Sequence, residues 1–238
     1  MKKIIFLFCL LACTSLQAQP LIVYMDAGSG KYGLKDTNGK LVVKTIYDGF
    51  TNFFEGMIAV NSGGITNPGL YTVGGLWGFI DSTGKGVIKP VYEKVLLFKE
   101  GLVAVKKNGK WGYINKAGKM MIAAKYDDAA GFSDGMGKII IDKKAGYVNK
   151  TGVVVIKPQY KFAGDFSEGL AAVSIDGEAY SAGSNVAMNA NFGYIDKKGK
   201  LVIPYQFSMA YAFDRRGYSW VQKDGREYKI DRTGKEIK

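Results

Sequence analysis

Histidine is absent from all 238 residues, and the two cysteines, Cys9 and Cys13, both lie close to the N-terminus. Histidine is the commonest general base and metal ligand, so its absence excludes Ser–His and Cys–His centres and histidine metal sites. Beyond Cys13 there is no cysteine to form a disulfide, a thiolate nucleophile or a cysteine metal site. The sequence therefore predicts a fold stabilised by packing, with no catalytic residue, no metal and no cofactor.

Long apolar runs are also missing after the first twenty residues. The chain opens with a methionine and two lysines, continues with an apolar run from Ile4 to Cys13, and offers a small-residue cleavage site at Ala18. This pattern is typical of a secretory signal peptide over residues 1–18, which leaves a single domain over residues 19–238. The alternative is a lipobox ending at Cys13, which would carry a lipid anchor. No transmembrane segment is expected.

Acidic residues are outnumbered, with 21 Asp and Glu against 33 Lys and Arg. Without the two leader lysines the mature chain keeps an excess of about ten positive charges, and a charge of that size favours anionic partners. For an exported protein these are polymers of the cell envelope rather than nucleic acid. The alternative interpretation is a lysine-rich surface that aids solubility.

An internal repeat organises the rest of the sequence. Aromatic–glycine pairs, or their equivalents, stand at Tyr32-Gly33, Trp77-Gly78, Trp111-Gly112, Ala145-Gly146 and Phe192-Gly193, with Glu227-Tyr228 as a degenerate sixth. The glycines are 45, 34, 34 and 47 residues apart, as expected for a 34-residue unit with two insertions. Further landmarks keep their offsets within each unit, including a second glycine, an aromatic residue and a phenylalanine.

These recurring segments resemble the WG-repeat family of bacterial proteins over essentially the whole mature chain. They are a Trp-Gly-aromatic-Ile-Asp/Asn core, a Gly-Lys turn, an Ile-Lys-Pro-x-Tyr segment and a Phe-x-Glu-Gly-Leu-Ala segment. The departures are Tyr32, Ala145 and Phe192 in place of tryptophan, and the eroded last unit. The resemblance implies a β-rich repeat module that is often found in envelope or secreted proteins.

Each unit reads as three antiparallel strands, for example 102–106, 111–115 and 120–126, joined by an Asn108-Gly109 hairpin and a turn at Gly118. The six units span residues 21–47, 57–92, 102–126, 137–160, 170–207 and 218–238. A unit of this size cannot bury its own core, and several strands are apolar on both faces, so the units must stack. We expect an all-β tandem repeat of about six three-stranded β-meanders stacked as an open, solenoid-like array; the alternative is a closed six-bladed propeller.

Most of the recurring polar and aromatic residues have structural explanations. An Asp or Asn recurs before the glycine turn of each unit, at Asp36, Asp81, Asn115, Asn149, Asp196 and Asp231. A side chain repeated at a turn is explained by turn formation, and the ligand ladder of a calcium loop is missing. Trp77 and Trp111 are expected in the core. Trp220 belongs to the degenerate sixth unit, where partial exposure makes it a candidate ligand contact.

Two insertions, residues 62–76 and 177–191, replace the same hairpin connection in the second and fifth units. Function in repeat proteins often lies where the pattern is broken, because insertions leave the stacked core intact. The candidate binding rim consists of Asn67, Tyr71, Tyr180, Asn185 and Asn189, with Trp220 as a further contact. The alternative is tolerated variation in loop length.

The sequence thus predicts a non-enzymatic binding or scaffold protein of the cell envelope, periplasmic, outer-membrane-associated or secreted. Its expected partner is an envelope glycan, an anionic polymer or another protein, engaged through the loop insertions. The alternative is a glycan-active enzyme that uses Asp/Glu pairs, such as Asp127 with Asp128 or Glu178. Adjacent residues on a strand point to opposite faces, which disfavours cooperation between Asp127 and Asp128.

Overall fold

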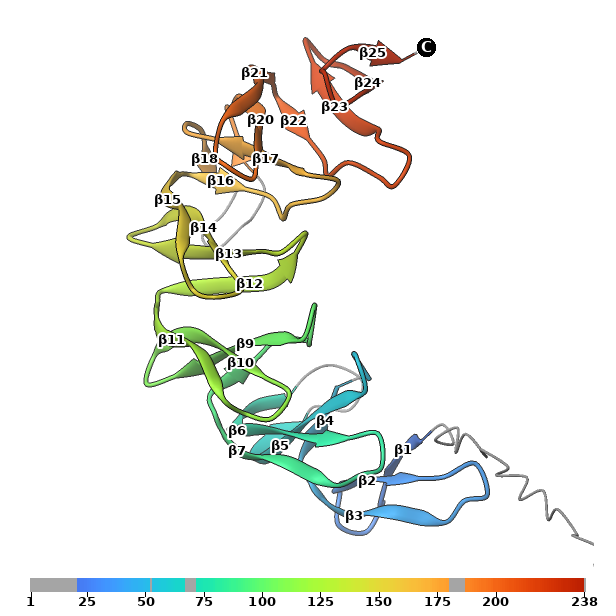
Figure 1. Cartoon of the computed structure of the whole chain (residues 1–238). Coiled ribbons are helices and arrows are strands. Elements are labelled where there is room, and N and C mark those ends of the chain that lie inside the picture. The colour runs from blue at the N-terminus through green and yellow to red at the C-terminus, as the bar shows by residue number, and fades with distance from the viewer. Residues whose placement is uncertain (1–20, 52, 67–71, 180–186, 238) are drawn as a thin grey trace, which may run out of the picture.

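The computed structural model describes residues 21–51, 53–66, 72–179 and 187–237. These residues form small antiparallel β-sheets that follow one another along an open arc, with the N-terminal and C-terminal sheets at its two tips (Figure 1). The predicted all-β, open, stacked array is confirmed, and the alternative of a closed propeller is not. In the part of the chain described, no helix is long and apolar enough to cross a membrane. Ala18 and Cys13 lie outside the described residues.

The first sheet contains β1 (Ile22–Met25), β2 (Tyr32–Lys35) and β3 (Leu41–Tyr47). The second contains β4 (Gly49–Phe50), β5 (Met57–Thr66), β6 (Thr72–Asp81) and β7 (Gly86–Tyr92). The third contains β8 (Lys94–Val95), β9 (Leu102–Lys107), β10 (Lys110–Asn115) and β11 (Met120–Tyr126), and the fourth contains β12 (Asp128–Ser133), β13 (Met136–Ile141), β14 (Lys144–Asn149) and β15 (Val154–Tyr160). The fifth contains β16 (Phe162–Ala163), β17 (Leu170–Ser174), β20 (Phe192–Asp196) and β21 (Leu201–Phe207), with a side hairpin of β18 (Glu178–Ala179) and β19 (Ala187–Met188). The sixth contains β22 (Met209–Ala210), β23 (Ser219–Lys223), β24 (Arg226–Ile230) and β25 (Glu236–Ile237).

The second to sixth sheets each have a first strand that the sequence pattern does not predict. These strands, β4, β8, β12, β16 and β22, follow directly after the repeated aromatic residue and form one edge of each sheet. Four of them are only two residues long, too short to show an alternating pattern. Because every four-stranded sheet has the same order, one long side of the array carries the first strands and the other carries β3, β7, β11, β15, β21 and β25.

Strands in the middle of the array are buried on both faces, because the sheets stack face against face. On β9, Leu102 and Ala104 belong to the cluster shared with the fourth sheet, whereas Val103 and Val105 belong to the cluster shared with the second. All four side chains are buried. Apolar contacts of this kind repeat from the first sheet to the last, so each interior sheet obtains its core from two neighbours and each end sheet from one.

A pair of aromatic rings joins each of four successive pairs of sheets. The ring centroids of Tyr113 and Phe132 lie 4.9 Å apart in an edge-on arrangement. The same arrangement occurs in Phe79–Phe98, Tyr147–Phe166 and Tyr194–Phe213, at 5.0, 4.7 and 5.0 Å. The phenylalanines of these pairs are at most 2 % exposed, whereas Phe53, at the same offset in the first unit, is 38 % exposed. The repeated phenylalanine is therefore an inter-sheet residue in every unit but the first.

The glycine of the aromatic–glycine pair permits a close approach between neighbouring strands. The register between β10 and β11 shifts across Gly112, between Trp111 and Tyr113, and again between Tyr113 and Ile114, which marks a bulge. A Cβ atom on Gly112 would lie 2.6 Å from the Ala124 nitrogen and 2.6 Å from the Ile122 oxygen. The other four glycines of the series meet the backbone of the following strand in the same way. The approach of another backbone, expected from the sequence, explains this residue.

The acidic residues of two repeated turns have structural roles. At the predicted turns, the side-chain oxygen of Asp36, Asp81, Asn115, Asn149, Asp196 or Asp231 accepts bonds from the backbone N–H groups two and four residues later. The acid–glycine turns also link neighbouring sheets. Glu100 accepts a hydrogen bond from the Gly135 N–H at 3.0 Å and pairs with Lys150 at 2.9 Å. Both partners belong to the next sheet.

The same link recurs along the array. Glu55 accepts the Gly101 N–H and pairs with Lys116, and Asp134 accepts the Gly169 N–H and pairs with Lys197. Glu168 pairs with Arg232 of the sixth sheet. These acids therefore join neighbouring sheets, a role that an acid–glycine pair in the sequence does not reveal.

These contacts predict how stability depends on pH. A hydrogen bond from the Thr83 hydroxyl lowers the pKa of Asp81; partial burial raises the pKa of Glu55, but hydrogen bonds from the Gly101 N–H and Lys116 outweigh that effect and lower it. A carboxyl whose pKa is lower in the folded than in the unfolded state contributes stability above its unfolded pKa and loses it as the pH falls. With no histidine to titrate, urea midpoints should be equal at about pH 6 and pH 8 and fall below about pH 4. A midpoint that changes between pH 6 and pH 8 would contradict this assignment.

A candidate binding groove on the first-strand side

An open groove with a volume of about 1150 Å³ lies on the first-strand side of the array, mainly between the fourth and fifth sheets. We call the small and apolar part of its lining the floor. It consists of residues on β12, β13 and β16, the glycine after β16, and the first residue of β20: Ala129, Ala130, Ile140, Phe162, Ala163, Gly164 and Phe192. Its ends reach Leu96 after β8 and Ala212 after β22.

Buried tyrosine hydroxyl groups hold the first strands that form the floor. The Tyr113 hydroxyl donates to the Ala130 carbonyl at 2.8 Å, and the Tyr147 hydroxyl donates to the Gly164 carbonyl at 2.6 Å. Tyr194 makes the equivalent bond to the Tyr211 carbonyl at 2.9 Å, and burial raises its pKa to about 12. Burial also raises the pKa of Tyr113 and Tyr147, so all three hydroxyls stay protonated and keep donating. The tyrosine after the glycine of the aromatic–glycine pair thus fixes the first-strand segment of the next sheet, and these segments contribute to the lining of the groove.

Two pairs of lysines line the groove, and only one pair is engaged. The Lys138 ammonium donates to the Ala163 carbonyl at 2.9 Å, and the Lys161 ammonium donates to the Gly177 carbonyl at 3.1 Å. Lys143 and Lys144, in the exposed turn from β13 to β14, have no ion pair or side-chain hydrogen bond with any described residue. Two cations at the rim are therefore open to a ligand.

Carboxylates share the lining with these lysines. They are Asp128, Asp142, Asp165 and Glu178. Lys138 Nζ lies 3.4 Å from Asp165 Oδ1, an ion pair without a well-formed hydrogen bond, and that oxygen has no hydrogen-bond partner within the described ranges. This oxygen is buried against Lys138, whereas the Asp165 side chain as a whole is 42 % exposed. The groove combines an apolar floor, free ammonium groups and free carboxylate oxygens.

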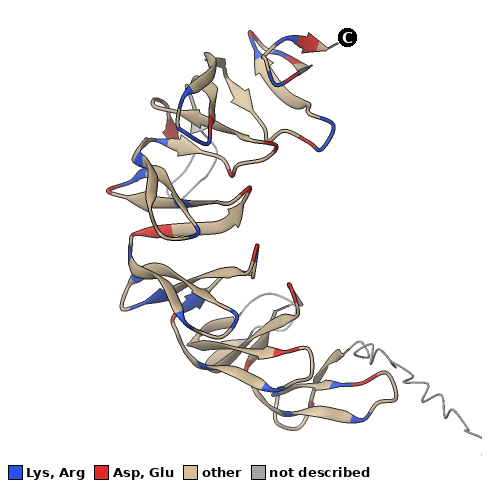
Figure 2. Cartoon of the chain, viewed as in Figure 1, with Lys and Arg blue, Asp and Glu red and all other residues tan. Residues whose placement is uncertain are grey.

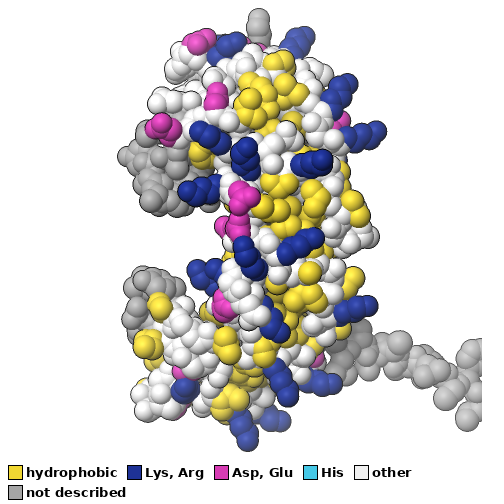
Figure 3. Space-filling model, turned by 90° about the vertical axis from the view of Figure 1, so that its left-hand side faces the viewer, with side chains coloured by type: hydrophobic (Ala, Val, Ile, Leu, Met, Phe, Trp, Pro, Cys, Tyr) yellow, Lys and Arg dark blue, Asp and Glu magenta, His cyan; other side chains and the backbone are white. Residues whose placement is uncertain are grey.

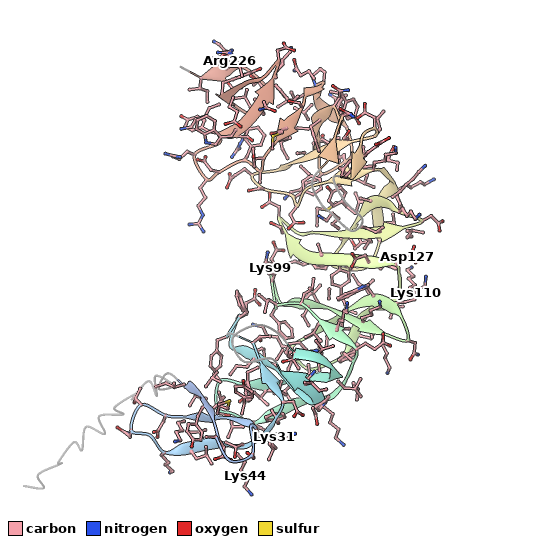
Figure 4. All side chains as sticks on the ribbon, turned by 180° about the vertical axis from the view of Figure 1, so that it is seen from behind. Lys31, Lys44, Lys99, Lys110, Asp127 and Arg226 are labelled. Atoms are coloured by element: carbon pink, nitrogen blue, oxygen red, sulfur yellow. The ribbon has the colours of Figure 1, made fainter. Side chains whose placement is uncertain are left out.

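Asp127, one of the predicted acid pair, is held outside this lining. Its carboxylate accepts a hydrogen bond from Lys110 at 2.5 Å and another from the Asp142 N–H at 2.8 Å; Figure 4 shows Lys110 and Asp127 together at one edge of the array. The bond from Lys110 is the main cause that lowers the pKa of Asp127. Asp127 therefore stays ionised and braces the β13–β14 turn, while Asp128 and Glu178 both line the groove. Within the described residues, no cluster of acids could hold a metal ion.

The predicted rim residues are only partly described. Asn67, Tyr71, Tyr180 and Asn185 lie outside the described residues. Asn189 is exposed at a positive φ of 52° after β19. The stem of the second insertion does reach the groove, because Gly177 and Glu178 belong to its lining. Sequence reasoning missed Lys143, Lys144 and the small residues of the floor, although the Lys-Lys turn and the Ala- and Gly-rich segments after the repeated tyrosine are visible in the sequence.

Two of the three tryptophans lie where the sequence predicts, and Trp77 is less buried than expected. Trp111 is 7 % exposed and belongs to an inter-sheet core. Trp77 is half-buried and packs against another core, and Trp220 is 51 % exposed. Trp220 lines a separate hollow of about 470 Å³ together with Arg216, Tyr218, Tyr228, Lys229 and Ile237. The structure therefore does not bring Trp220 into the groove.

The opposite, last-strand side is apolar and edged by lysines. Exposed apolar side chains recur on its strands, including Val42, Val87, Met121, Val154 and Val202. Figure 3 shows apolar side chains running down the molecule with basic side chains beside them. Prolines stand in β7, β15 and β21, where a residue without an N–H is tolerated because the strand lies at an edge. Lysines and prolines on an edge strand oppose pairing with another chain. Figure 2 shows that the charged residues elsewhere gather mainly at the turns.

Comparisons with known proteins agree with the repeat. A family described as "WG containing repeat" matches residues 32–64, 77–111, 111–144, 146–178 and 192–226. No curated protein sequence matches the chain. Among solved structures, the chain is similar to Kluyveromyces lactis Hsv2, with 10 % identity, a TM-score of 0.48 and coverage of 91 % of this chain and 72 % of that one. It is also similar to the extracellular domain of a hybrid two-component system from B. thetaiotaomicron, with 10 % identity, a TM-score of 0.41 and coverage of 88 % of this chain and 32 % of that one.

Proposed function

This chain belongs to the WG containing repeat family, and from that premise we propose that it is an exported, non-catalytic protein of the cell envelope that binds an acidic glycan in the groove between its fourth and fifth sheets. The observation that carries the proposal is the pair of unengaged ammonium groups, Lys143 and Lys144, above an apolar floor. Ammonium groups attract the carboxylate or phosphate groups of such a polymer, and the excess of positive charge raises its concentration near the protein.

The floor and the carboxylates fit the rest of a sugar ring. The rings of Phe162 and Phe192, with centroids 6.4 Å apart, offer apolar surface for the C–H face of a sugar. Asp165 and Glu178 offer oxygens that accept hydrogen bonds from hydroxyl groups. A ligand with both hydroxyl and anionic groups can bond to the lysines and to the carboxylates of the lining. A polyanion without hydroxyl groups would place its charge beside those carboxylates with no hydrogen bond to offset the repulsion.

The experiment is a titration of the purified protein with a soluble polyuronate, with a neutral polysaccharide of similar length as the control ligand. The Lys143→Ala/Lys144→Ala variant should bind the polyuronate about tenfold more weakly or worse, as expected for the loss of two charge-assisted contacts. The matched control, Lys89→Ala/Lys157→Ala, removes the same charge from the last-strand side and should bind like the parent protein. If both variants bound equally weakly, binding would depend on net charge and not on the groove. If the parent protein did not bind the polyuronate at all, the proposal would be wrong.

Export is supported by the first eighteen residues, whose basic start and short apolar run are those of a signal peptide. The intact mass of the protein recovered from its own cells separates the two processing routes. A chain that starts at Gln19 indicates ordinary cleavage, and one that starts at an acylated Cys13 indicates a lipoprotein. An unprocessed chain beginning at Met1 would contradict export.

A glycan-cleaving enzyme is the second candidate, since Asp128 and Glu178 both line the groove. Its test is product release from the polyuronate and the neutral glycan after prolonged incubation. The binding proposal expects no new reducing ends in either sample. Product formation that disappears in a Glu178→Gln variant would establish the enzyme instead.

A further inference from the structure

The two ends of the array differ from its interior in a specific way. The glycine of each aromatic–glycine pair is the repeat glycine. Inside the stack, the residue directly after this glycine shares a core cluster with one residue of the next sheet. That partner stands two positions after the next sheet's own repeat glycine. Five such pairs occur: Leu34 with Ile80, Phe79 with Ile114, Tyr113 with Val148, Tyr147 with Ile195, and Tyr194 with Ile230. All ten side chains are at most 2 % exposed. This pair is the repeated apolar contact on which stacking rests.

The corresponding positions on the two outer faces both hold lysine. Lys35 stands two positions after Gly33, on the face of the first sheet that no preceding sheet covers in the described residues. Lys229 follows Tyr228, which takes the glycine position because it pairs with Val221 as Gly193 pairs with Val173. If the sixth sheet packed against the first, or against the first sheet of a second copy, the stacking pair would be Lys229 with Lys35.

Each of these lysines lies over an aromatic ring of its own sheet. Lys35 Nζ is 3.3 Å from the centroid of the Tyr24 ring, and Lys229 Nζ is 4.9 Å from that of Trp220. Trp220 also adds bulk, since the equivalent positions in the second, third and fifth sheets are Ala59, Ala104 and Ala172. The fourth sheet has Lys138 there, and its ammonium group bonds to the Ala163 carbonyl of the next sheet. The end faces are therefore cationic, and the C-terminal one carries an aromatic ring where three interior sheets have alanine.

We propose that Lys35 and Lys229, with Trp220, keep the array open and monomeric by closing its two end faces to the sheet that would otherwise stack there. The sheet excluded is either the protein's own opposite end, which would close a ring, or the end of a second copy, which would build a head-to-tail chain. Stacking would remove two ammonium groups from water beside each other, and burial of unpaired like charges is strongly unfavourable. This also explains why the array is open.

The test restores the interior pattern at both ends with Lys35→Ile, Lys229→Tyr and Trp220→Ala in one variant. Size-exclusion chromatography with light scattering and small-angle X-ray scattering should find the parent protein monomeric with the radius of gyration of an open arc. The triple variant should show either a mass that rises with protein concentration, from head-to-tail chains, or a monomer with a smaller radius of gyration, from ring closure. The matched control, Lys40→Ile/Lys235→Tyr, changes lysines of the same two sheets that lie in turns, and it should behave like the parent protein.

A second variant does not depend on new apolar surface. Lys35→Glu alone would place a carboxylate opposite Lys229 of another copy, so weak association that disappears at high salt is expected. A triple variant and a Lys35→Glu variant that both remain monomers with the parent's radius of gyration would overturn the proposal. Association of the turn-lysine control to the same extent as the triple variant would overturn it as well.

Discussion

Replacement of Phe132 by alanine is expected to lower the free energy of unfolding by about 3–5 kcal/mol, the usual cost of removing a buried phenylalanine. Phe132 is 1 % exposed, and its ring lies 4.9 Å from Tyr113 of the preceding sheet. The cavity would open at the middle of the stack, where sheets receive their core from their neighbours. Because a stacked repeat transmits stability only between adjacent units, the transition should also become broader or separate into two steps.

The measurement is urea denaturation followed by circular dichroism and by tyrosine and tryptophan fluorescence. Phe53→Ala is the matched control, since Phe53 occupies the same repeat offset but is 38 % exposed. It should cost less than about 1 kcal/mol, as is usual for substitutions away from the core. Similar losses for the two variants would contradict the inter-sheet role of this aromatic pair.

Replacement of Gly112 by alanine should have the second large effect on stability. The new Cβ would lie 2.6 Å from backbone atoms of β11, and a backbone cannot move aside as a side chain can. Overpacking usually costs about 1–3 kcal/mol, and a contact with backbone at this distance should reach the upper end of that range or exceed it. The hydrogen bond from the Tyr113 hydroxyl to the Ala130 carbonyl should weaken as well, because Tyr113 directly follows Gly112.

Gly86→Ala provides the matched control for this change. Gly86 lies on β7, and a Cβ there would meet no atom within 4 Å. Alanine should be neutral or stabilise the protein by up to about 1 kcal/mol, because it lowers the entropy of the unfolded chain. The measurement is the thermal unfolding midpoint of each variant. Equal midpoints for Gly112→Ala and Gly86→Ala would show that the β11 backbone does not lie as close to Gly112 as the structure indicates.

Much of the architecture is readable from the sequence because it depends on repeated local chemistry. The glycine turns, the Asp/Asn residues that cap them and the double burial of strands such as β9 all appear as fixed offsets. The first strands do not, because two residues show no periodicity and their pairing depends on the neighbouring strand. The inter-sheet bonds of Glu100 and of the Tyr147 hydroxyl are equally hidden, since both partners belong to the next unit and only stacking brings them together.

The candidate site was predicted less well than the fold. The insertion at 177–191 adjoins the candidate groove, because its stem contributes Glu178 to the lining. The residues that we propose to face the ligand, Lys143, Lys144 and Phe162, lie instead on the repeat itself. A groove is a property of the surface between sheets, and no single unit encodes it. Trp220 was correctly expected to be exposed, but it lies on an end face.

Hydrogen–deuterium exchange of the protein with and without saturating polyuronate would locate the binding site. Binding in the groove should slow exchange in segments 128–130, 138–145 and 161–165, which line it, and leave exchange unchanged in β3, β7 and β11 on the last-strand side. Protection confined to the last-strand side, or spread evenly over all basic turns, would contradict a binding site in the groove.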